Sequence, residues 1–138
     1  MKGRKRHLVV DTEGFVLKAF VSEAHYYDGT VGTWLLPGLR DRFPRLKKLW
    51  ADGTYSGAFV EQARILGIDI EITTHLSEQP GFHVIPWRWV VERTFAWLGN
   101  YRRLSKDYEY WVYTSDAMIY AAMVHIMLRR LARLQAAT

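Results

Sequence analysis

Residues 46–73 alternate between strand and helix patterns, and this order leaves few folds open. Leu46–Ala51 is typical of a strand, and Ala58–Leu66 is typical of a helix that Gly67 closes in the C-terminal capping position. Ile68–Thr73 alternates apolar and polar residues, which indicates a strand with one buried face. Because a helix between two consecutive strands lets them run parallel, the pattern predicts an α/β fold with helices layered on a sheet.

A β-hairpin is expected before this unit. His7–Val10 and Phe15–Val21 are rich in β-formers, and Asp11–Gly14 between them is a favourable turn sequence.

Two further helices are predicted. Thr30–Phe43 has helical apolar spacing, but Gly32 and Pro37 favour a short or kinked helix. Ala117–Leu134 is expected to form a last helix capped by Thr114–Asp116, with a core-forming first half and an exposed basic second half. No repeat, low-complexity segment or linker interrupts the sequence, so we expect residues 1–138 to form one domain.

Composition narrows the class of protein. The chain has 138 residues, a net charge of +5 and a sequence pI near 9.6, which favours an acidic partner such as nucleic acid. It has no cysteine, which excludes disulfides and Cys-based zinc sites. The apolar run Ala117–Leu128 is too short to cross a bilayer, which needs about 20 residues. We therefore expect a soluble cytoplasmic protein without membrane contact.

The segment from Pro86 to Tyr108 is predicted to be a helix with one carboxylate among cations. At about 100° per residue, Arg88, Arg103 and Lys106 fall on the same face as Glu92. One interpretation is an ordinary surface ion pair between Arg88 and Glu92. The other is an acid that binds a metal and bases that bind a polyanion, which the surplus of positive charge favours.

Asp52 is expected at the carboxyl end of the strand that precedes it, where open α/β sheets place ligands. Gly53 beside it would let a substrate approach closely. The alternative is that Asp52 makes a structural Asx-turn. Together with Glu92 it would supply hard oxygen ligands for Mg²⁺ or Mn²⁺, the ions used in pairs for phosphoryl transfer on nucleic acid.

Three segments resemble the DDE transposases of bacterial insertion sequences, in particular the subgroup numbered five. These segments are Arg4–Thr12, Trp50–Gly57 and Arg88–Leu98 continued by Tyr101–Glu109. The resemblance covers nearly the whole chain. It implies a ribonuclease-H-like mixed sheet flanked by helices, and DNA transposition by metal-dependent cleavage of transposon ends and strand transfer to target DNA. It also implies a homodimer or higher oligomer, and a bacterial, nucleoid-associated protein.

By this resemblance Asp52 is the second catalytic acid and Glu92 the third, and both bind metal, with two ions in the complete site. Arg88 matches the arginine four residues before the glutamate in the family's Tyr-Arg-Glu-Lys signature. The tyrosine and lysine positions of that signature are Ile85 and Gly99 here. The nearby bases Arg102, Arg103 and Lys106 are expected to replace the lysine and to hold DNA.

The resemblance also implies a missing part. In the family the first catalytic Asp lies on a central strand before the basic segment, and this chain begins inside that segment. Asp11 lies at the hairpin tip, where turn chemistry accounts for it. We therefore expect an N-terminally truncated catalytic domain that lacks the first central strand. The alternative function is a non-catalytic DNA-binding remnant, or the downstream half of a split transposase that needs an upstream polypeptide.

Other residues have two interpretations each. The basic segment containing Arg4, Lys5 and Arg6 would contact DNA phosphates or form a solvated tail. The tryptophans around Glu92 would stack on flipped bases or pack into the core, and Trp89 lies nearest its face. The five histidines show no spacing typical of a metal site, so we expect them on the surface or in the core.

Overall fold

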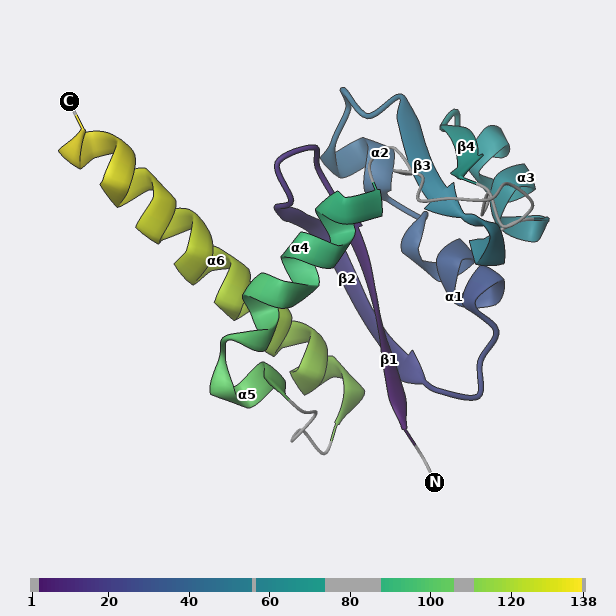
Figure 1. The fold of residues 1–138 in the computed structure, drawn as a ribbon. Helices are drawn as coiled ribbons and strands as arrows, with labels where there is room; N and C mark the ends of the chain where they lie inside the picture. Colours follow the sequence, from purple (N-terminus) through teal and green to yellow (C-terminus); the bar gives the residue numbers. More distant parts are fainter. Residues whose placement is uncertain (1–2, 56, 74–87, 106–110, 138) are drawn as a thin grey trace, which may run out of the picture. The chain divides into compact units, whose positions relative to one another are not determined.

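A computed structural model describes residues 3–55, 57–73, 88–105 and 111–137 (Figure 1). The chain divides into two compact units, which we describe separately. The first contains Met1–Gly3 and Glu23–Trp89, and the second contains Arg4–Ser22 and Val90–Thr138. The predicted surface loop at residues 74–85 and the start of the helix predicted from Pro86 lie outside the described residues.

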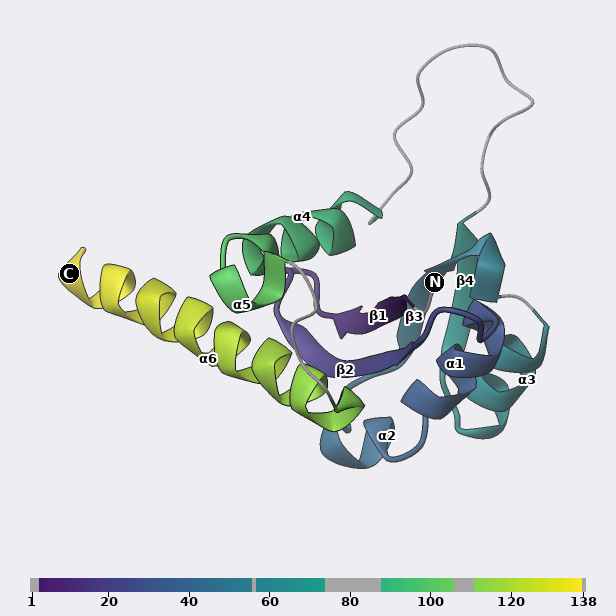
Figure 2. The same ribbon diagram turned by 90° about the horizontal axis from the view of Figure 1, so that it is seen from below.

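The first unit contains the predicted strand, helix and strand. β3 (Lys48–Asp52) pairs in parallel with β4 (Asp69–Thr73), and α3 (Ala58–Ile65) connects them. Their bounds lie within two residues of the prediction. Phe59 and Ala63, one helical turn apart, are the buried face of α3. Figure 2 shows α3 beside the two strands. The α/β prediction is confirmed, because a parallel pair joined through a helix is present.

The helical region before β3 forms two helices. α1 (Asp28–Leu35) begins earlier than predicted, and α2 (Leu39–Arg42) follows after a break. Pro37 lies in the break, and Gly38 has a φ of 75°, a conformation that glycine adopts without a steric penalty. The predicted interruption near Pro37 is therefore confirmed. The chain forms two separate helices there instead of one kinked helix.

The second unit is built on a hairpin of β1 (Arg4–Val10) and β2 (Val16–Glu23). The prediction of a hairpin is confirmed, although β1 begins at Arg4. The solvated-tail interpretation is therefore wrong for Arg4, Lys5 and Arg6, which lie in a strand and are each partly buried.

The second unit also contains α4 (Arg88–Gly99), α5 (Arg102–Ser105) and α6 (Val112–Ala136). The prediction of one continuous helix up to residue 108 is wrong, because α4 ends at Gly99. Asn100 N–H and Tyr101 N–H bond to carbonyls three residues earlier, the tighter pattern that closes a helix. The helical periodicity that put Arg103 on the face of Glu92 therefore does not continue across the break.

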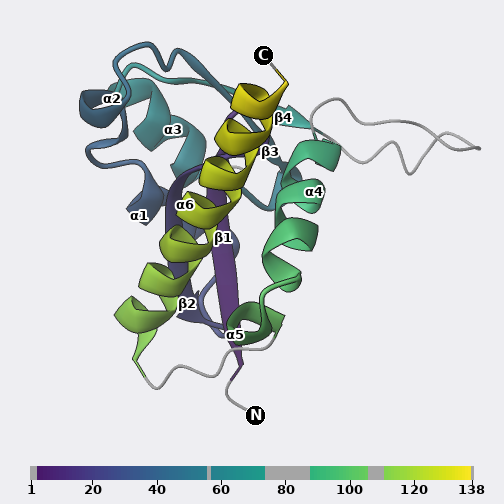
Figure 3. The ribbon, with the colours of Figure 1, turned by 90° about the vertical axis from the view of Figure 1, so that its left-hand side faces the viewer.

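The core of the second unit joins the hairpin to all three helices. Its buried residues are Ala19, Val21, Leu98, Leu104, Ile119 and Ala122. Figure 3 shows α6 lying along the hairpin. The cap predicted at Thr114–Asp116 is wrong, because α6 starts at Val112 and the Asp116 carboxylate instead accepts the Val21 N–H at 2.6 Å. Within the described residues, no helix is long and apolar enough to cross a membrane.

The ribonuclease-H-like arrangement stays a prediction. Within the described residues the strands form two separate two-stranded sheets, β1 with β2 and β3 with β4.

Candidate functional site

Asp52 is the last residue of β3 and is half-buried. Its Oδ1 accepts hydrogen bonds from the N–H of Thr54, at 2.9 Å, and from the Thr54 hydroxyl. The Asx-turn interpretation is therefore confirmed as local geometry. A carboxylate has two oxygens with about four acceptor sites, so these two bonds leave room for further ligands.

The turn after Asp52 is open. Gly53 and Thr54 are exposed, and a Cβ added at Gly53 would meet no atom within 4 Å. This end of β3 is therefore exposed at the turn.

Asp28 is a second acid near this turn, and no sequence motif predicted its position there. It lies in the first turn of α1, where a Cβ added at Gly29 would stand 3.2 Å from the carbonyl oxygen of Thr54. Burial raises the pKa of the Tyr55 hydroxyl well above its usual range, and the charges of Asp28 and Asp52 raise it further. Tyr55 therefore stays a neutral hydrogen-bonding group. The sequence signal was the Asp-Gly pair at a helix start.

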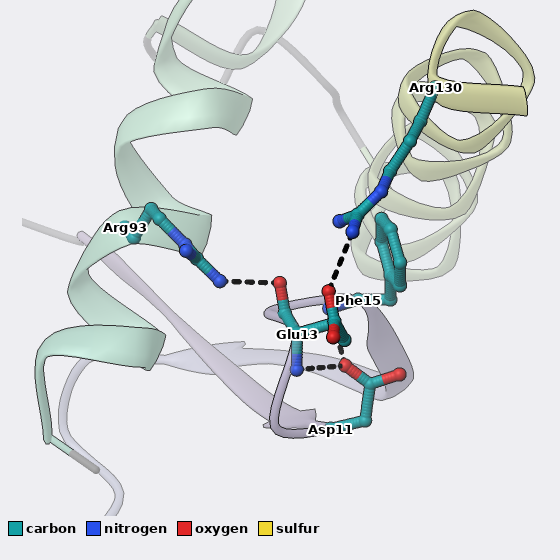
Figure 4. Close-up of polar contacts among 5 residues, drawn as sticks. All are labelled: Asp11, Glu13, Phe15, Arg93 and Arg130. Carbon is teal, nitrogen blue, oxygen red and sulfur yellow. Dashed lines mark hydrogen bonds and ion pairs between the residues drawn. The ribbon is translucent and has the colours of Figure 1, made fainter. Parts of the chain in front are cut away.

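Glu92 is exposed on α4, and the two residues after it bind the hairpin tip. Arg93 donates from its guanidinium to the Glu13 carbonyl, and the buried Thr94 hydroxyl donates to the Gly14 carbonyl. Figure 4 shows Arg93 reaching the tip from α4. These bonds restrict the rotation of α4 about its axis and so determine the side on which Glu92 projects.

Asp11 has a structural role at that tip. Its Oδ1 accepts the N–H groups of Glu13 at 2.9 Å and of Phe15 at 3.0 Å (Figure 4). Arg130 of α6 pairs with the Glu13 carboxylate at 2.7 Å and lies over the Phe15 ring. The turn chemistry predicted for Asp11 is confirmed.

The predicted DNA-binding cations have different surroundings. Arg102 and Arg103 are exposed on α5, whereas Arg6 donates to the Leu104 carbonyl at 2.7 Å and so ties β1 to α5. The side chain of Arg88 lies outside the described part of the structure, as does Lys106.

The aromatic and histidine predictions are settled where the structure describes these residues. Trp97 packs under the Arg93 guanidinium, 4.8 Å from its ring centroid, and near Phe15, which supports the packing interpretation. His7 is buried against Ser22, and His125 bonds to the Tyr101 hydroxyl. The side chain of Trp89 is not among the described ones.

The donor chemistry of the two predicted acids fits a hard divalent ion, because both supply carboxylate oxygens. Among the described residues, no three His, Asp or Glu side chains are gathered closely enough to hold a metal. Asp52 and Glu92 belong to different units, so each is described in its own surroundings.

Comparison with known proteins identifies the family. The model of the transposase DDE domain matches residues 1–127. A putative transposase for insertion sequence element IS402 from Burkholderia cepacia is 36% identical over 118 residues, covering 78% of this chain and 54% of the relative. The chain thus spans about half the length of this curated relative, and no solved structure matches it. The chain belongs to the DDE transposases of insertion sequences.

Proposed function

We propose that this chain forms part of the catalytic domain of a transposase that cuts transposon ends and joins them to target DNA. The observation that supports this most is the position of Asp52, at the carboxyl end of a parallel strand and beside an open turn. The family membership supplies the reaction class.

Asp52 and Glu92 are the proposed metal ligands. Bound at these oxygens, Mg²⁺ or Mn²⁺, with two ions in the complete site, would supply Lewis-acid chemistry for phosphoryl transfer. Thr54 holds the Asp52 carboxylate in one orientation through two hydrogen bonds. Arg93 and Thr94 hold α4, and Glu92 with it, against the hairpin tip.

The cations would hold the substrate. Arg102 and Arg103 are exposed and adjacent at the start of α5, a suitable arrangement for DNA phosphates. Arg88 and Lys106 are proposed for the same role from the family resemblance. Arg4, Lys5 and Arg6 are proposed as further phosphate contacts. Arg6 also has a structural role, because it donates to the Leu104 carbonyl.

The ribonuclease-H-like sheet and the first catalytic Asp belong to this proposal. In this proposal the first central strand of that sheet and the first catalytic Asp are supplied by an upstream segment, either of the same protein or of a separate polypeptide. The second candidate is a DNA-binding chain that does not cut. It is favoured if that upstream frame contains no Asp in an apolar strand.

The test is nicking of DNA that carries the transposon ends, with Mg²⁺ or Mn²⁺, by this chain joined to its upstream reading frame. Asp52→Asn or Glu92→Gln should lower the nicking rate by at least about 10³-fold, because several kcal/mol of transition-state stabilisation are lost. DNA binding should change little. Asp69→Asn and Glu61→Gln, at exposed acids of the first unit, are the matched controls.

Full nicking by both variants would show that the acids are assigned wrongly. DNA binding without nicking, even in the joined protein, would favour the second candidate.

A further inference from the structure

Gly32 lies in the middle of α1 and is buried there. Glycine inside a helix costs about 1 kcal/mol of stability relative to alanine, so its presence calls for a reason in the packing. Two aromatic rings supply the reason. A Cβ added at Gly32 would stand 2.8 Å from a ring carbon of Tyr55 and 2.8 Å from one of Phe59. Because carbon atoms in contact stay about 3.5–4.0 Å apart, a residue with a Cβ would push both rings away from α1.

The Tyr55 ring contacts two helices of the first unit. It lies against α1 at Gly32, and its centroid is 5.5 Å from that of Phe59 on α3, with the two ring planes tilted by 57°. Phe59 is only 5% exposed and belongs to the buried face of α3. The half-buried Tyr55 ring is therefore held by the packing between α1 and α3.

Tyr55 is also the last residue of the turn that follows Asp52. This turn is a short 3₁₀ helix, η1 (Gly53–Tyr55), which begins directly after β3. Thr54, the residue before Tyr55, donates its N–H and its hydroxyl to Asp52 Oδ1. A displacement of the Tyr55 ring would move the backbone of Thr54 with it. The two donors that orient the Asp52 carboxylate therefore depend on where the ring is held.

We propose that Tyr55 is a positioning residue, whose ring, packed against Gly32 and Phe59, holds η1 in place and so fixes the orientation of the Asp52 carboxylate. The consequence for catalysis rests on the proposed function, whereas the orientation of Asp52 is measurable by itself.

The ring carries this role, and the hydroxyl has no charge to contribute. Burial raises the pKa of the Tyr55 hydroxyl well above its usual range, and the charges of Asp28 and Asp52 raise it further. Tyr55→Phe therefore removes a neutral group and keeps the ring, whereas Tyr55→Leu removes the ring.

Nuclear magnetic resonance of the isotope-labelled 138-residue chain tests the proposal, because side-chain couplings report the χ1 rotamer of Asp52. The wild type and Tyr55→Phe should give the couplings of a single staggered rotamer. In Tyr55→Leu the couplings should be averaged over several rotamers. Gly32→Ala keeps the ring but displaces it and should average them as well, so the test does not depend on the leucine variant alone.

Two matched controls should keep the couplings of the wild type. Trp34→Leu removes an aromatic ring from the same helix, at a residue 40% exposed that packs edge-on against Tyr26 with ring centroids 5.2 Å apart. Gly53→Ala adds a methyl group in η1 itself, where it would meet no atom within 4 Å. Circular dichroism should show that all variants keep the helix content of the wild type.

Nicking kinetics of the chain joined to its upstream frame measure the consequence for the reaction. Tyr55→Leu should lower kcat per folded molecule by at least about tenfold, because a misplaced carboxylate loses stabilisation of the transition state. The KM for DNA should change by less than about twofold. Tyr55→Phe should restore kcat to nearly the wild-type value, and Trp34→Leu should leave it unchanged.

A single Asp52 rotamer in both Tyr55→Leu and Gly32→Ala would overturn the proposal. Averaged couplings in Tyr55→Phe would assign the effect to the hydroxyl and would overturn it too. Averaged couplings in Tyr55→Leu with an unchanged kcat would support the positioning role and contradict the role of Asp52 in the proposed function.

Discussion

Two turns of this protein share the same local chemistry but differ in their surroundings. At the hairpin tip, Asp11 accepts two backbone N–H groups, and at the end of β3, Asp52 accepts two donors from Thr54. The first turn is enclosed by α4 and α6, whereas the second is open at Gly53. An aspartate turn alone therefore does not identify a functional acid. The surroundings distinguish an enclosed turn from an exposed one.

The two turns should differ most in their response to an added methyl group, which replaces a glycine of each turn by alanine. Gly14 has a φ of 90°, and a Cβ there would stand 3.0 Å from the Thr94 hydroxyl oxygen and 3.2 Å from the Trp97 ring. Gly14→Ala should lower the free energy of unfolding by about 2–4 kcal/mol. Gly53→Ala should change it by less than about 0.5 kcal/mol. Urea unfolding measures both, and equal effects would contradict the distinction.

Removing one hydroxyl tests how the closed turn is held. Thr94→Val keeps the side-chain shape but leaves the Gly14 carbonyl without its buried donor. We expect a loss of about 1–2 kcal/mol in unfolding free energy. The matched control is Thr33→Val, whose exposed hydroxyl donates to the Thr30 carbonyl within α1 and should cost less than about 0.5 kcal/mol. If Thr33→Val lowers the unfolding free energy as much, the bond at the hairpin tip stabilises the fold no more than an exposed one.

A third carboxylate, Asp116, extends the comparison to the pH dependence of stability. Burial raises its pKa above the usual carboxyl value, and the bond from the Val21 N–H only partly offsets this. Because the folded chain holds this proton more tightly than the unfolded one, stability should fall as pH rises from the ordinary carboxyl pKa through the raised one. In Asp116→Asn this contribution should vanish, as thermal unfolding between pH 3 and pH 7 would show. An unchanged pH profile in the variant would refute the role of Asp116.

The smallest effect is expected at the rim of the closed turn. Arg130 and Glu13 form an ion pair with side chains 47% and 58% exposed. Arg130→Met, which keeps apolar cover over Phe15, should lower the unfolding free energy by at most about 1 kcal/mol. Most of that loss should disappear in high salt. A loss that persists in salt would assign the stabilisation to packing rather than to charge.

Local patterns predicted local structure well. The strand, helix and strand of residues 46–73, the hairpin turn at Asp11 and the turn at Asp52 all depend on residues close in sequence. The prediction needed only strand alternation, a glycine cap and the capacity of an aspartate to accept nearby N–H groups.

Contacts between distant residues were not predictable. Asp116 was interpreted as a helix cap because its partner, Val21, lies 95 residues away. The proximity of Asp28 to the turn after Asp52 depends on how α1 packs against residues that follow β3. The predicted helical periodicity extended past Gly99, although α4 ends there. The prediction therefore placed residues beyond α4 on the face of Glu92. Asp52 and Glu92 were singled out by the strand-end position and by the surplus of positive charge, and the catalytic roles proposed for them come from the family resemblance.

The most direct test of the account compares Asp52→Ala with Asp11→Ala in the chain joined to its upstream frame. Both nicking rate and unfolding free energy are measured. Asp52→Ala should abolish metal-dependent nicking and cost about 1 kcal/mol or less of stability. Asp11→Ala should lower stability by about 1–2 kcal/mol, and its folded fraction should nick at the wild-type rate. Nicking that survives Asp52→Ala and is lost in folded Asp11→Ala would reverse the roles assigned to the two turns.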